Sequence, residues 1–294
     1  MFKGSFPALI TPFKNGAVDE DSFRALLDWH IEEGTDGFVP CGTTGESPTL
    51  SHDEHKQVTE ICIDQVKGRK PIIAGAGSNS TREAVELAKH AKLAGADAVL
   101  VVTPYYNKPT QGGMYAHFKA VHDEGGLPVI IYNIPPRSIV DMTPETMAEL
   151  AKLPNIVGVK DATADLFRPQ VTRAAMNGGA DDFCFLSGED GTAVPFLAAG
   201  GHGCISVTAN IAPRLCADMQ RAWRDGDVAK CMELQERLTP LHDAMFCEAS
   251  PGPVKHAAKL LGKCEADVRL PMTDISDESK EQVRSAMVGA GLLN

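Results

Sequence analysis

Lys160 ends an apolar run that is typical of a buried strand. Residues 155–163 read NIVGVKDAT, and the run over 156–159 stops at this charged residue. Burial of an ammonium group without a partner is costly, which favours the neutral amine. A neutral amine is a nucleophile and can form a Schiff base with a carbonyl substrate. The alternative is a lysine that points to solvent or pairs with Asp161, and for a lone lysine at a strand end both interpretations stand.

Two further groups of residues that follow predicted strands could act with such a lysine. Tyr132 ends the preceding strand, where a phenol could move protons to and from a carbinolamine. Taken alone, it is more simply a core tyrosine with a satisfied hydroxyl. Residues 42–45, Gly-Thr-Thr-Gly, give a turn with two hydroxyls and backbone N–H groups that can hold a small carboxylate. An ordinary tight turn between a strand and a helix would carry the same residues.

Short apolar runs that alternate with helical patterns must position these groups. Near-continuous apolar strands between helices indicate a parallel sheet covered on both faces. Eight such units favour an α/β protein with a closed (β/α)8 TIM barrel, in which reacting groups lie at the C-terminal ends of the strands. An open doubly wound sheet is the alternative, but no G-x-G-x-x-G motif follows a strand. The predicted strands are Phe6–Thr11, Gly37–Cys41, Pro71–Ala76, Ala98–Thr103, Pro128–Asn133, Ile156–Asp161, Asp182–Ser187 and Gly203–Thr208.

Signals for helix starts agree with this order of elements. Residues 51–54 and 80–83 both read Ser-x-x-Glu, which fits a capping box. Thr143 followed by Pro144 places a proline at the first helical position after a capping hydroxyl. Helices are therefore predicted to begin after each of these three signals.

The pattern changes after the eighth predicted strand. From about residue 213 onward the helical periodicity continues, and no convincing strand follows. We therefore expect residues 1–224 to form the barrel and residues 225–294 to form a C-terminal helical domain. Its predicted helices span 228–246, 252–261 and 277–290.

Composition excludes several classes of function. The net charge is −11 and no Lys/Arg cluster is present, which argues against nucleic acid and anionic membranes as partners. No apolar stretch is long enough to span a bilayer, and the first residues lack a signal-peptide pattern. The eight cysteines form no C-x-x-C pair, so a cytoplasmic location is expected and a zinc site is not. Only His202 lies near a predicted strand, at its N-terminal end, so neither a metal nor a cofactor is predicted.

Several motifs together carry a family resemblance. CGTTGES, TPYYNKP, YNIPPRS, GVKDAT, SGEDGTA, GGHGCISVTAN and RLPM occur in this order. With them the chain resembles, over essentially its whole length, the dihydrodipicolinate synthase / N-acetylneuraminate lyase family. The resemblance implies that Lys160 forms an imine with pyruvate. In the synthases the derived enamine then attacks L-aspartate 4-semialdehyde to give 4-hydroxy-tetrahydrodipicolinate, in lysine and diaminopimelate biosynthesis.

The resemblance also implies roles for matched hydroxyl-bearing residues. Tyr132 matches the central acid–base tyrosine of the family. Thr43 and Tyr106 match its partners in a hydroxyl relay, with Tyr106 reaching into a neighbouring subunit's site. Thr44 matches the residue whose backbone N–H holds a substrate carboxylate.

Arg137 bears on the substrate within this resemblance. It matches an arginine that grips the carboxylate of the semialdehyde, and a guanidinium fork suits that group. Without the resemblance it would be a surface-loop arginine. Together with the pair Tyr105-Tyr106, it favours a synthase over a lyase for long sugar chains. Pro136 before Arg137 departs from the family pattern and stiffens the loop, while Gly188 and Ile205 match backbone positions that face bound pyruvate.

A second site and an assembly follow from the resemblance as hypotheses. Some synthases of the family are inhibited by L-lysine at a subunit interface, and the family is commonly a homotetramer, a dimer of dimers. His52 and His55 share a helix face, but a solvated first turn or a metal site would also explain them. The positions that match the lysine site are Ser47, Pro48, His52, His55, Asn79, Glu83 and Tyr105.

The same residues allow other functions to be considered. N-acetylneuraminate lyase, or a 2-keto-3-deoxy sugar acid aldolase, would also trap pyruvate on Lys160. A non-catalytic binding barrel would not need both this lysine and Tyr132. A metal-dependent aldolase would need His and carboxylate ligands that converge at the strand ends.

Overall fold

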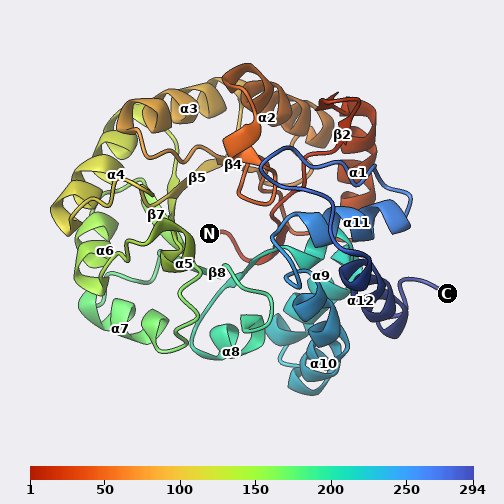
Figure 1. Ribbon diagram of the computed structural model, residues 1–294. Coiled ribbons are helices and arrows are strands. Elements are labelled where there is room, and N and C mark those ends of the chain that lie inside the picture. The colour runs from red at the N-terminus through yellow and green to blue at the C-terminus, as the bar shows by residue number, and fades with distance from the viewer. The chain divides into compact units, whose positions relative to one another are not determined.

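Two compact units make up the chain, and the computed structural model describes residues 1–294 (Figure 1). The first unit contains residues 1–3 and 72–205, and the second contains residues 4–71 and 206–294. The second unit therefore combines two stretches that lie far apart in the sequence.

A parallel sheet forms the centre of the first unit. Its strands pair in chain order from β4 to β9, as consecutive strands joined by helices do. Both faces are buried, which explains why the strand sequences are almost continuously apolar. The strands are β4 (Ile73–Gly75), β5 (Ala98–Val102), β6 (Val129–Asn133), β7 (Ile156–Asp161), β8 (Cys184–Ser187) and β9 (Gly203–Ser206).

Helices alternate with the strands of the first unit, with two of them, α5 and α6, between β6 and β7. Figure 1 shows α3, α4, α6 and α7 on the outer side of the strands. The loops that follow the strands, together with the short helix α5, therefore lie at the C-terminal ends of the strands. The helices are α3 (Thr81–Ala94), α4 (Gln111–Gly125), α5 (Pro135–Ser138), α6 (Pro144–Ala151), α7 (Arg168–Ala175) and α8 (Ala193–Ala198).

The second unit is mainly helical. Helix α9 packs on α10, and α12 packs on both α10 and α11, which buries their apolar faces. Its helices are α1 (Glu20–Glu32), α2 (His52–Val66), α9 (Pro213–Arg224), α10 (Val228–Ala244), α11 (Gly252–Leu260) and α12 (Asp277–Gly289), with short 3-10 helices η1 (Ser47–Thr49) and η2 (Thr208–Asn210). Its strands are β1 (Gly4–Pro7), β2 (Phe13–Lys14) and β3 (Ala17–Val18). No helix of the chain is long and apolar enough to cross a membrane.

The predicted strand at residues 37–41 is wrong as a regular strand. Val39 makes only an isolated parallel bridge to Ala8. Its N–H donates to the Pro7 carbonyl at 3.1 Å, and its carbonyl accepts from Leu9 at 2.9 Å. The segment is fully buried, but it turns at Pro40 and at Cys41, which has a positive φ, so no regular ladder forms.

The helix-start signals have mixed outcomes. Ser51 and Glu54 form the predicted capping box at the start of α2, and Thr143 caps α6 with Pro144 in its first turn. The capping box predicted at Ser80 is wrong, because the Ser80 side chain makes no capping hydrogen bond. Glu83 instead accepts a hydrogen bond from the Ser78 hydroxyl.

Candidate active site

Lys160 and Tyr132 lie side by side at the ends of two neighbouring strands. They are directly paired in the register of β6 and β7. The Lys160 Nζ lies 4.1 Å from the centroid of the Tyr132 ring, and each residue is only 6% exposed. The amine therefore lies largely buried against the face of an aromatic ring. The predicted adjacency of these two residues is confirmed.

The alternative of an ion pair between Lys160 and Asp161 is not what the structure shows. Asp161 Oδ1 accepts hydrogen bonds from the Thr163 backbone N–H at 2.9 Å and from its hydroxyl at 2.7 Å. Burial raises the pKa of the Asp161 carboxyl, and the hydrogen bonds from Thr163 oppose that shift. Asp161 thus binds the loop that follows β7 through Thr163. Lys160 has no carboxylate partner.

Gly188 lies directly against the Lys160 side chain. A Cβ added at this position would lie 3.1 Å from Lys160 Cε and 2.8 Å from the Ala162 Cβ. The Gly188 N–H donates to the Asp161 carbonyl at 2.6 Å, which ties the loop after β8 to the end of β7. Ile205 lies fully buried on β9, the strand that pairs with β8. Gly188 is therefore a position where a larger residue would press on the lysine.

Arg137 lies on the one-turn helix α5, and its side chain is exposed. Buried Ser138 holds the turn in place, because its hydroxyl accepts a hydrogen bond from Thr103 Oγ1 at 3.1 Å. The oxygen of the same hydroxyl lies 2.9 Å from the carbonyl oxygen of Ile134 and 2.9 Å from that of Val140. A rigid turn that begins with two prolines thus presents an exposed guanidinium in the loop directly after Tyr132.

The loop after β5 presents Tyr106 outward. This residue is 89% exposed and has a positive φ of 71°, which is uncommon for a bulky side chain. Asn79 Nδ2 donates to the neighbouring Tyr105 carbonyl at 3.2 Å, and Asn107 Nδ2 donates to the Asn79 carbonyl at 2.8 Å. Burial raises the pKa of the Tyr105 phenol, and the Glu83 carboxylate adds to that shift. The first unit thus brings together Asn79, Glu83 and Tyr105 from the predicted lysine site.

The turn that contains Thr43 and Thr44 belongs to the second unit. It is bounded by two residues with positive φ, Cys41 and Glu46, each at 56°. Within it the Gly45 N–H donates to the Gly42 carbonyl, and the Glu46 N–H donates to the Thr43 carbonyl, both at 3.1 Å. Thr44 is buried, at 5% exposure.

The second unit also holds the remaining residues of the predicted lysine site. Ser47 and Pro48 form the start of η1 directly after the threonine turn. His52 is exposed at the first position of α2, whereas His55 is buried one turn later. The two histidines therefore do not form one solvent-facing pair.

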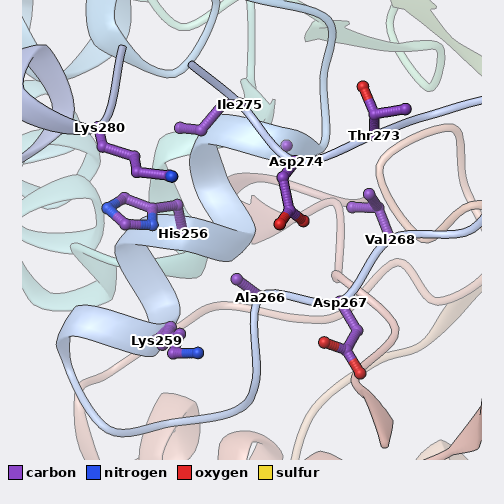
Figure 2. A pocket seen from close by; sticks show the side chains of 10 residues that line it. His256, Lys259, Ala266, Asp267, Val268, Thr273, Asp274, Ile275 and Lys280 are labelled. Carbon is purple, nitrogen blue, oxygen red and sulfur yellow. The ribbon is translucent and has the colours of Figure 1, made fainter. Parts of the chain in front are cut away.

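A cavity of about 320 Å³ that sequence reasoning did not find lies in the second unit (Figure 2). Figure 2 shows Lys280 beside the His256 ring, and burial together with Lys280 and Lys259 lowers the pKa of this histidine. Both lysines already pair with carboxylates outside the lining, at 2.8 and 2.9 Å. The cavity contains no predicted site residue. Its lining is Gly252, His256, Lys259, Ala266, Asp267, Val268, Thr273, Asp274, Ile275 and Lys280.

Known proteins resemble this chain over its full length. The model of the dihydrodipicolinate synthetase family matches residues 1–289. A 4-hydroxy-tetrahydrodipicolinate synthase of Bradyrhizobium diazoefficiens is 61% identical, with 100% of this chain and 98% of the relative covered.

Solved structures agree with the sequence relatives. A chloride-inhibited dihydrodipicolinate synthase of Acinetobacter baumannii, complexed with pyruvate, is 45% identical, with both chains fully covered and a TM-score of 0.96. The enzyme of Cyanidioschyzon merolae, with lysine bound, is 39% identical, with 99% of each chain covered and a TM-score of 0.95. These likenesses confirm the predicted fold class, a (β/α)8 barrel with a C-terminal helical extension.

Proposed function

The chain belongs to the dihydrodipicolinate synthetase family, and on this premise we propose that it condenses pyruvate with L-aspartate 4-semialdehyde. The product is 4-hydroxy-tetrahydrodipicolinate, a step of lysine and diaminopimelate biosynthesis, and the intermediate is a Schiff base on Lys160. The observation that carries this proposal is the unpaired Lys160 amine, 6% exposed and 4.1 Å from the Tyr132 ring centroid.

The covalent steps follow from the chemistry of a buried amine. The Lys160 nitrogen adds to the keto carbon of pyruvate, and the carbinolamine loses water to form an imine. The imine withdraws electrons, so the methyl group loses a proton and gives an enamine. The enamine carbon attacks the aldehyde carbon of the semialdehyde. The amino group of the semialdehyde then attacks the imine carbon, closes the ring and displaces the Lys160 amine.

Proton transfer in these steps is assigned to hydroxyl groups. We propose that Tyr132 gives and takes the protons of the carbinolamine, since its ring contacts the lysine amine. Thr43 and Tyr106 are proposed as its relay partners by their match to the family motif. Tyr106 acts in this scheme across a subunit interface, and its 89% exposure in one chain is consistent with that role.

Substrate binding is assigned to backbone groups and one arginine. Thr44 is proposed to hold the carboxylate of pyruvate through its backbone N–H. Arg137 is proposed to bind the carboxylate of the semialdehyde, and its exposed place on a rigid turn supports this. Gly188 and Ile205 are proposed to line the pyruvate position, as the contact of Gly188 with the lysine side chain suggests.

Regulation, assembly and location complete the proposal. The synthase of Cyanidioschyzon merolae binds lysine, and we propose that Ser47, Pro48, His52, His55, Asn79, Glu83 and Tyr105 bind L-lysine here. The assembly is proposed to be a homotetramer. The cytoplasm is its proposed location, since six of its eight free cysteines are buried as ordinary apolar side chains.

A comparison of substrates tests the proposal. The purified protein is given pyruvate together with L-aspartate 4-semialdehyde. In parallel assays it is given N-acetylneuraminate alone or a 2-keto-3-deoxy sugar acid alone. Turnover of the semialdehyde alone, strongly reduced by Arg137→Ala, is the expected result. Turnover of a sugar acid, with none of the semialdehyde, would reassign the protein to another pyruvate lyase.

A further inference from the structure

A buried ion pair between Glu46 and Lys255 lies at the end of the turn that contains Thr43 and Thr44. Glu46 ends this turn and is 3% exposed, and its Oε1 accepts from Lys255 Nζ at 2.7 Å. Lys255 lies on α11 and has no exposed side-chain surface. The second carboxylate oxygen, Oε2, accepts from the backbone N–H of Arg269 at 2.9 Å. Two segments near the C-terminal end of the chain therefore hold the last residue of the turn.

The same two cations are fixed by further contacts within the second unit. Lys255 Nζ lies 4.1 Å and the Arg269 guanidinium 4.2 Å from the centroid of the Phe13 ring. Arg269 also donates two hydrogen bonds to Glu54, at 2.6 and 2.7 Å. Burial lowers the pKa of the Lys255 ammonium, and the Glu46 carboxylate opposes that shift. The pair is thus part of a rigid cluster.

The turn needs such a cluster because its backbone is strained. A left-handed conformation disfavours residues with a Cβ, and both Cys41 and Glu46 adopt it. Strained conformations of this kind persist only where the surroundings determine them. Thr11 gives a second tether, because its hydroxyl donates to the Gly45 carbonyl at 2.7 Å. With the Glu46 side chain released, the peptide groups of Thr43 and Thr44 would lose one of the contacts that set their direction.

We propose that Lys255 is a positioning residue, which holds Glu46 so that the Thr43-Thr44 peptide groups stay directed at the carboxylate of pyruvate. The inference rests on the proposed function, in which Thr44 binds that carboxylate. It gives the C-terminal helical segment a part in substrate affinity, although Lys255 contacts no reacting atom.

Two variants separate this role from a general effect on folding. Lys255→Met removes the ammonium and keeps most of the volume. Glu46→Gln keeps the shape, but its amide has only one acceptor oxygen for two donors, so one tether is lost. Lys263→Met is the matched control, because the Lys263 amine lies 4.2 Å from the Trp29 ring centroid and has no role at the turn. Near-UV circular dichroism establishes that each variant is folded.

The readout is the pyruvate concentration that gives half of the maximal borohydride-trapped adduct on Lys160. Lys255→Met and Glu46→Gln should each raise it about tenfold or more, with the same adduct at saturation. The double variant should resemble the worse single variant, because both changes release the same turn. Lys263→Met should stay within about twofold of the wild type.

Other results would contradict either this inference or the proposed function. Folded variants with an unchanged half-saturating concentration, or effects that multiply in the double variant, would overturn the inference. If Lys255→Met does not fold, Glu46→Gln decides alone by the same criterion. Absence of any adduct on the wild-type protein would instead refute the proposed function, so the two failures are distinguishable.

Discussion

Lys160 shows how much of the site a strand pattern can predict. Consecutive strands of a parallel sheet pair, so residues that end two successive apolar runs lie side by side. The contact between Lys160 and Tyr132 follows from this rule. The pair of Glu46 and Lys255 was beyond prediction, because its members lie 209 positions apart and a single charge in a helical pattern names no partner.

Gly188→Ala should impair the lysine without unfolding the protein. The added methyl would lie 3.1 Å from Lys160 Cε and 2.8 Å from the Ala162 Cβ, which is closer than ordinary contact. We expect the rate of borohydride-trapped pyruvate adduct formation to fall about tenfold or more. The control is Gly191→Ala, where an added Cβ meets nothing within 4 Å. Equal rates for the two variants would contradict the described packing.

At the scale of elements, predictions were reliable where several signals agreed, and a single strong signal was not enough. The β7 strand has the predicted bounds because its apolar run, its neighbours and its charged end all agree. The hairpin of β2 and β3 was missed, although the Asn15-Gly16 turn between them is a strong hairpin signal. Its strands of two residues each are too short to show an alternating pattern.

The two Ser-x-x-Glu segments give a matched pair of helix-start variants. Ser51→Ala removes the side-chain acceptor of the Glu54 N–H in α2. We expect a loss of about 1 kcal/mol in the free energy of unfolding, measured by urea denaturation. Ser80→Ala removes no capping bond and should change this free energy by less than about 0.5 kcal/mol. A larger loss for Ser80→Ala than for Ser51→Ala would contradict the assigned caps.

At the scale of the whole molecule, the alternation of strands and helices was sufficient to predict the barrel class. It did not indicate that residues 4–71 and 206–294 form one compact unit. That grouping depends on side chains such as Arg269 and Glu54, which meet across 215 positions and leave no local pattern. The division of the chain at residue 224 and the homotetramer stay predictions.

Acid should destabilise the fold through His30. This side chain is fully buried, its ring nitrogens have no hydrogen-bond partner, and burial lowers its pKa from 6.5 to about 3. The unfolded state therefore binds the proton more tightly, and stability is lost as the pH falls below 6.5 towards 3. Between neutral pH and pH 5 this histidine should cost about 2 kcal/mol in the free energy of unfolding.

His30→Leu tests this contribution, because the variant cannot take up the proton. Its free energy of unfolding should fall by about 2 kcal/mol less than that of the wild type between pH 7.5 and pH 5, measured in urea. Leu27→Val, which changes a buried side chain that takes up no proton, should keep the wild-type dependence. An unchanged dependence in His30→Leu would show that other groups cause the acid sensitivity.

The central claim is that the Lys160 amine forms a Schiff base with pyruvate. Intact-mass measurement after borohydride reduction with pyruvate, on the wild type and on Lys160→Ala, tests it most directly. The account predicts a single reduced adduct on the wild type and none on the variant. Absence of an adduct on the wild type, or an adduct that persists in Lys160→Ala, would contradict it.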